Sequence, residues 1–172
     1  MNKPARRTAL LAMLVALALI LGWLESLIPL PLPVPGLKLG LSNIVLLFAL
    51  YTRGTKSSLL LLVAKVTLSS LLFAGFSAFA YALTGGLFAL GGMALLKNRK
   101  GFSLIGVSIA GAVLHNTGQV AAAAVLLGTV QIVRLLSVLL VAGVVTGALT
   151  GLAASLVLNA LEKSEATRKE EK

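Results

Sequence analysis

The chain alternates between long apolar runs and short clusters of charged residues, proline and glycine. Cutting it at these clusters leaves six apolar segments, residues 8–28, 37–51, 57–73, 76–96, 102–127 and 131–161, of which the second is the shortest. A helix of about 20 apolar residues is long enough to cross the hydrocarbon core of a bilayer. The pattern therefore predicts an all-α membrane protein, a bundle of six transmembrane helices.

The first two segments are separated by a stretch in which proline alternates with apolar residues, from Pro29 to Pro35. Proline inside a helix removes a backbone hydrogen bond and clashes with the preceding turn. We therefore expect residues 29–36 to form an extended segment that dips into the membrane interface.

The composition agrees with a membrane protein of one domain. Of the 172 residues, 58% are hydrophobic and 12% are charged, and the mean hydropathy is +1.02, whereas about a quarter of a soluble domain is charged. We expect one transmembrane domain over residues 1–162, a charged cytoplasmic tail over residues 163–172, and no soluble catalytic domain. The apolar run from Thr8 is not followed by a small-residue cleavage site, so we interpret it as a retained first helix.

Lysine and arginine fall mainly on one side of the predicted bundle. The loops on the other side, residues 29–36, 74–75 and 128–130, contain neither. Twelve of the fifteen precede the first segment or follow the second, fourth or sixth: Lys3, Arg6, Arg7, Arg53, Lys56, Lys97, Arg99, Lys100, Lys163, Arg168, Lys169 and Lys172. By the positive-inside rule both termini are cytoplasmic, and the net charge of +10 reflects orientation in the membrane rather than binding to nucleic acid.

Eight polar residues lie inside the predicted spans or at their outer ends. They are Glu25, Lys38, Asn43, Lys65, His115, Asn116, Gln119 and Arg134. Such groups are costly in a bilayer and usually face the bundle interior or a cavity. At about 1.5 Å of rise per residue, Lys65 lies near the midplane and the others lie in the outer half. We expect them to bind a small-molecule solute from outside, and the excess of positive charge favours an anionic or phosphorylated one.

A purely structural interpretation is open for most of these residues. Glu25 could form an ion pair with Lys38 or Arg134, the long basic side chains could reach lipid headgroups, and His115 could hydrogen-bond between helices. Lys65 is the hardest to explain in this way, because an ammonium near the midplane cannot easily reach either interface. It needs a partner within the protein or a ligand.

Several kinds of chemistry do not fit the residues present. The chain has no cysteine and no aspartate, a single histidine, and no G-x-x-x-x-G-K-[ST] loop. We therefore expect no disulfide, no metal site, no aspartate-rich diphosphate site and no P-loop nucleotide hydrolysis. Catalytic residues and cofactors are not expected, and the energy for any transport must come from a partner or a gradient.

The sixth segment carries Gly143, Gly147 and Gly151 at a spacing of four residues. Small residues at this spacing let helix backbones approach closely. We favour packing within the chain over a dimer interface.

Three stretches carry the most specific signature in the chain. They are Glu25-Ser-Leu-Ile-Pro-Leu-Pro-Leu-Pro-Val-Pro-Gly-Leu-Lys38-Leu-Gly-Leu-Ser-Asn43, the Gly85-Gly86 pair, and Gly111-Ala-Val-Leu-His115-Asn116-Thr-Gly-Gln119. With these stretches the chain resembles the bacterial Gx transporter family, which is also called heptaprenyl diphosphate synthase component I. The resemblance covers nearly the whole chain and implies a multi-pass protein of the bacterial cell membrane.

That family is similar in size and layout to the S components of energy-coupling factor transporters, which capture a vitamin-like solute and dock on a transmembrane coupling subunit with its ATPases. The resemblance implies a solute-binding transport subunit surrounded by membrane lipid. Ala12 and Ala16 would match the Ala-x-x-x-Ala contact to the coupling subunit. The family's other name implies an alternative, a membrane accessory of a soluble prenyl diphosphate synthase subunit in isoprenoid or quinone metabolism.

Overall fold

The computed structural model describes residues 3–27 and 40–170, and every regular element in these ranges is a helix. The α-helices are α1 (Lys3–Ser26), α2 (Ser42–Arg53), α3 (Thr55–Ser69), α4 (Gly75–Leu96), α5 (Leu104–Leu127) and α6 (Leu136–Glu170). A π-helical turn, η1 (Ser70–Ala74), joins α3 to α4, and a 3-10 helix, η2 (Val130–Leu135), leads into α6. The prediction of an all-α bundle of six helices is confirmed.

The helices differ widely in length. Five of the six, all except α2, are long and apolar enough to cross a membrane, in some cases together with an adjoining turn. Helix α2 has 12 residues and is therefore about 18 Å long, which is less than the roughly 30 Å of a bilayer core. Helix α6 has 35 residues and continues as a helix to Glu170, through most of the predicted charged tail.

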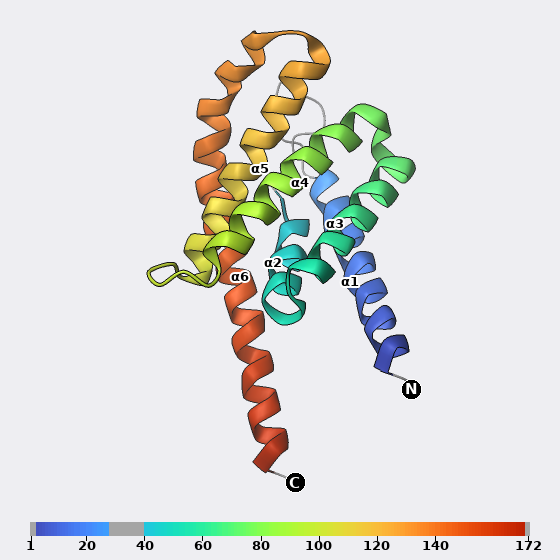
Figure 1. Ribbon diagram of the computed structural model, residues 1–172, viewed down its shortest axis with the longest axis vertical. Coiled ribbons are helices and arrows are strands. Elements are labelled where there is room, and N and C mark those ends of the chain that lie inside the picture. Colours follow the sequence, from blue (N-terminus) through green and yellow to red (C-terminus); the bar gives the residue numbers. More distant parts are fainter. Residues whose placement is uncertain (1–2, 28–39, 171–172) are drawn as a thin grey trace.

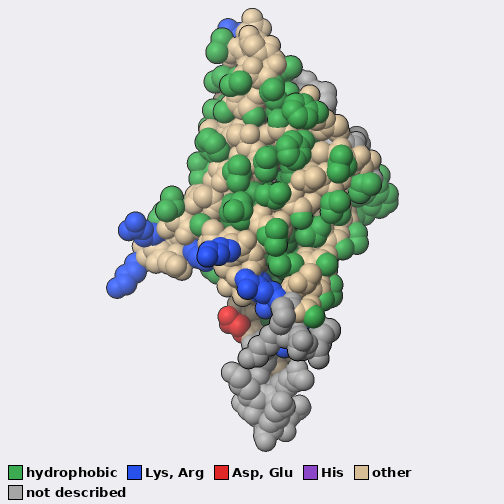
Figure 2. All heavy atoms as spheres, turned by 45° about the vertical axis from the view of Figure 1, so that its right-hand side comes forward, with side chains coloured by type: hydrophobic (Ala, Val, Ile, Leu, Met, Phe, Trp, Pro, Cys, Tyr) green, Lys and Arg blue, Asp and Glu red, His purple; other side chains and the backbone are tan. Residues whose placement is uncertain are grey.

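Both described ends of the chain lie toward the same end of the bundle. Figure 1 shows the start of α1, the end of α6, the α2–α3 turn and the α4–α5 turn in its lower half, and the α3–α4 and α5–α6 connections in its upper half. We call the lower end the basic end, because most of the lysines and arginines visible in Figure 2 lie toward it, below a broad apolar surface, and one lies at the opposite end. This arrangement agrees with the charge pattern, and the cytoplasmic orientation of the basic end remains a prediction.

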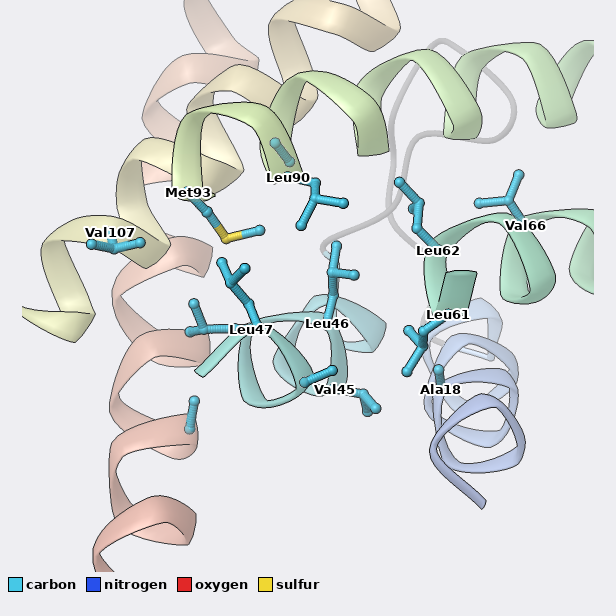
Figure 3. Close-up of a cluster of buried hydrophobic side chains, with 14 residues drawn as sticks. Ala18, Val45, Leu46, Leu47, Leu61, Leu62, Val66, Leu90, Met93 and Val107 are labelled. Carbon is cyan, nitrogen blue, oxygen red and sulfur yellow. The ribbon is translucent and has the colours of Figure 1, made fainter. Parts of the chain in front are cut away.

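The hydrophobic core is built around α2, which packs against α1, α3, α4 and α6. Leu46 and Leu47 of α2 are at most 1% exposed. They meet Leu61 of α3 and Met93 of α4 in the cluster that Figure 3 shows. Because α2 begins in mid-bundle and runs toward the basic end, its N-terminal end lies inside the protein.

The glycine stripe of α6 faces α5. A Cβ at Gly147 would lie 2.6 Å from the Cα of Ile109, and one at Gly151 would lie 2.9 Å from the Cα of Ile105. Side chains larger than hydrogen would therefore separate the two backbones. The favoured interpretation of this stripe as packing within the chain is confirmed.

Candidate functional site

A cavity of about 80 Å³ lies among α1, α2, α3, α4 and α5, at the N-terminal end of α2. A single ordered water needs roughly 10–15 Å³ of such space, so several waters or one small solute would fit. Its polar lining residues are Glu25, Ser42, Asn43, Lys65, Ser69, Ser70, His115 and Gln119. The other lining residues are Ala18, Leu19, Gly22, Gly40, Val66, Ala78 and Ala82.

The cavity extends from the middle of the bundle into the half away from the basic end. Lys65 lies ten residues after Thr55, the first residue of α3, or about 15 Å along the helix. Gln119 lies fifteen residues after Leu104, the first residue of α5, or about 22 Å along it. These heights place Lys65 near the middle of the bundle and Gln119 farther from the basic end, and their depth in a membrane stays a prediction.

The first turn of α2 forms the floor of the cavity, and Lys65 is bound to it. The Lys65 Nζ donates to Ser42 Oγ at 2.7 Å and to Asn43 Oδ1 at 3.3 Å. A buried ammonium in the middle of the bundle is thus held by polar groups of a neighbouring helix, as its burial requires. These contacts fix the position of its positive charge beside the cavity.

Glu25, near the end of α1, also binds the start of α2. Its Oε1 accepts from the Gly40 backbone N–H at 2.5 Å, and its Oε2 accepts from the Leu41 N–H at 3.0 Å. The first N–H groups of a helix have no partner within the helix and carry a partial positive charge, so a carboxylate is stabilised there. Gly40 has φ +92°, a conformation that glycine adopts readily. Glu25 therefore ties α1 to α2 at the edge of the cavity.

The wall on α5 carries two polar atoms without a partner. His115 and Gln119 are one helical turn apart and 9% and 3% exposed. Among the described residues, His115 Nδ1 and Gln119 Oε1 are buried and have no hydrogen-bond partner. An unsatisfied buried polar group costs about 1–3 kcal/mol. This wall is therefore the part of the cavity that most needs a ligand or ordered water.

The position of this wall is set by a close approach of α4 to α5. A Cβ at Gly85 of α4 would lie 2.7 Å from the His115 carbonyl oxygen and 2.7 Å from Gln119 Cγ. A Cβ at Gly118 of α5 would lie 2.9 Å from the Gly85 Cα. Only a pair of glycines permits this spacing of the two helices, which holds both polar side chains at the cavity.

The structure brings five of the eight predicted residues together. Glu25, Asn43, Lys65, His115 and Gln119 line the cavity.

Asn116 and Arg134 do not line the cavity. Asn116 faces α6, where its Nδ2 donates to the Leu139 carbonyl oxygen at 2.6 Å. Arg134 is exposed in η2. Lys38 lies outside the described residues.

Three serines and two glycines of the cavity, Ser42, Ser69, Ser70, Gly22 and Gly40, were not predicted as site residues. Ser42 had a signal, because serine before an apolar helix is a typical helix start. Ser69 and Ser70 reach the cavity where α3 passes into the π-helical turn η1. Such turns often occur at functional sites, but no sequence pattern predicted this one. Gly40 lies in the first signature stretch, but it contributes through its backbone, a role that the residue type alone did not predict.

Residues 14–157 match the family model described as heptaprenyl diphosphate synthase component I. The chain belongs to this family. The match contains every residue that lines the cavity of this component I protein. Family membership, predicted from the resemblance, is confirmed.

The fold of this component I protein is similar to that of a solved structure described as the S component of a bacterial ECF transporter. The two share 20% sequence identity, with a TM-score of 0.67, over 94% of this chain and 98% of the other. A likeness at this identity establishes a shared fold. No curated protein sequence matches the chain.

Proposed function

We propose that this component I protein is the solute-binding subunit of a membrane transporter and takes up a small solute from outside the cell. The observation that carries the proposal is the polar cavity with the unpartnered atoms His115 Nδ1 and Gln119 Oε1. Buried polar groups in proteins are nearly always hydrogen-bonded, so a purely structural core would pair both atoms. The S-component fold of the similar structure supports the same function.

Such a subunit depends on partners for energy, and we place the coupling subunit, with its ATPases, on α1. Helix α1 packs mainly against α2 and α3, and Ala12 and Ala16 are exposed on it. Small residues at this spacing permit close approach of another helix. The remaining apolar surface of the bundle faces lipid.

Native mass spectrometry of the protein extracted from bacterial membranes tests the proposal. A bound small molecule should appear on the wild type and be lost from Lys65→Met, because this change removes the positive charge from the cavity. Lys56→Met is the matched control, since Lys56 is exposed near the basic end. Equal retention of the molecule by wild type and Lys65→Met would contradict the proposed role of the cavity.

The family description favours one alternative, a membrane accessory of a soluble prenyl diphosphate synthase subunit. In that case a synthase subunit should co-purify with the chain from detergent extracts. It should do so equally with wild type and Lys65→Met, and no small molecule should occupy the cavity.

A further inference from the structure

We propose that the solute is a compact, non-aromatic molecule that combines an anionic head with a neutral hydrogen-bond donor such as a hydroxyl. This inference rests on the proposed function, because it names the class of solute that the same cavity would take. It follows from the chemistry of the α5 wall, the floor and the remaining lining.

The α5 wall requires a donor. The side-chain oxygen of Gln119 can only accept hydrogen bonds, and it has no donor among the described residues. The buried His115 Nδ1 one turn away can donate or accept, according to its tautomer. A hydroxyl suits this pair, because it donates to the amide oxygen and also accepts. A carboxylate cannot donate to Gln119, and an ammonium would lie in the same small cavity as Lys65.

The floor favours an anion. Lys65 brings a positive charge to the cavity, and its bonds to Ser42 and Asn43 hold it at the start of α2. The side-chain oxygen of Asn43 accepts from Lys65, and the amide nitrogen of Asn43 is a second donor group beside the ammonium. Glu25 lines the cavity too, but both of its oxygens accept from backbone N–H groups directly before α2, those of Gly40 and Leu41. An anionic head between Lys65 and Asn43 would therefore meet donors.

The remaining lining favours a compact aliphatic molecule. The cavity measures about 80 Å³, and its described lining contains no Phe, Tyr or Trp, so the His115 imidazole is the one aromatic ring there. Its apolar walls come from small or branched side chains such as Ala18, Ala78 and Val66. A flat ring would have only this small imidazole to stack on, and no large aromatic side chain. The two polar regions are thus within reach of one short carbon chain.

Titration calorimetry with four probes on the purified full chain tests this class of solute. Glycerate has both groups, propionate lacks the hydroxyls, glycerol lacks the anion, and benzoate replaces the hydroxylated chain with a ring. We expect glycerate to bind most tightly and each of the others to bind roughly tenfold more weakly or worse.

Variants of two glutamines test whether the preference for glycerate over propionate comes from the α5 wall. Gln119→Met keeps the size of the side chain but removes the acceptor, so glycerate should lose its advantage over propionate. Gln131→Met is the control, because Gln131 is exposed in η2 and does not line the cavity. An undiminished glycerate preference in Gln119→Met would overturn the assignment.

The outcomes separate this inference from the proposed function. If propionate, glycerol or benzoate binds as tightly as glycerate, the class of solute is wrong while a solute-binding cavity stands. If no probe binds but native mass spectrometry finds a bound molecule, a hydroxylated aliphatic anion supports the inference, and an aromatic or cationic molecule overturns it. If neither method finds any bound molecule, the proposed function fails as well.

Discussion

Replacing Gly85 with alanine should separate α4 from α5 and disturb the wall that carries His115 and Gln119. The new Cβ would lie 2.7 Å from the His115 carbonyl oxygen, 2.7 Å from Gln119 Cγ and 3.1 Å from His115 Nδ1. The carbonyl belongs to the backbone, so it cannot move without α5. The helices must therefore shift apart by several tenths of an ångström, since packed interiors have few voids to absorb the methyl group.

The size of the effect follows from two opposing terms. Overpacking in a filled interior costs about 1–3 kcal/mol, whereas glycine to alanine inside a helix gains roughly 0.5–1 kcal/mol of unfolding free energy. Gly91→Ala isolates the second term, because Gly91 lies in the same helix and a Cβ there would have nothing within 4 Å. Gly85→Ala should therefore be less stable than Gly91→Ala by about 1–3 kcal/mol.

Thermal unfolding in detergent, followed by circular dichroism, measures this difference on wild type and the two variants. The melting temperature of Gly91→Ala should equal or exceed that of wild type, and that of Gly85→Ala should be lower than both. Binding of glycerate should weaken in Gly85→Ala alone. Equal melting temperatures for the two variants would refute the close approach of α4 to α5 and the reasoning that it positions the cavity wall.

Two further predictions concern orientation and the α5–α6 contact. The chain has no native cysteine, so single cysteines at the exposed positions Asn98 and Ser164 should be shielded from an impermeant thiol reagent in intact cells, while one at Gln131 should react. Labelling at Asn98 from outside would overturn the predicted topology. Asn116→Ala removes the bond to Leu139 and should lower the free energy of unfolding by about 1–3 kcal/mol, without selectively weakening glycerate binding, and Asn98→Ala should be neutral. Lost binding at an unchanged melting temperature would instead assign Asn116 to the site.

The helices could be predicted because residues near their ends mark where they begin and end. The fifth segment was predicted to end at residue 127, and Gly128 ends α5 with φ +62°. The start of α5 at Leu104 follows Ser103, whose side chain accepts from the Gly106 N–H at 3.1 Å. The central place of α2 had no such signal, since its short length alone does not show whether a helix crosses the membrane or stops inside the bundle.

The polar residues of the site could be predicted in part, because a bilayer confines polar groups to the interior. The direction in which each one points depends on neighbouring helices. Asn116 follows His115 directly, so helical geometry turns it by about 100°, and the structure shows that it then meets α6. The sequence predicted this rotation, but the list of expected binding residues still contained both His115 and Asn116.

Glu25 shows why the charge of the cavity could not be counted from side chains. The sequence offered Lys38 or Arg134 as ion-pair partners, whereas the described contacts include two backbone N–H groups at the start of α2. A helix N-terminus carries roughly half a positive charge. The side-chain count of one lysine and one glutamate in the described lining therefore understates the positive charge at the floor. Because the charges of Lys65 and Glu25 offset each other, the helix end leaves the floor net positive, and this is a physical reason for an anionic head that the count of basic residues along the sequence does not give.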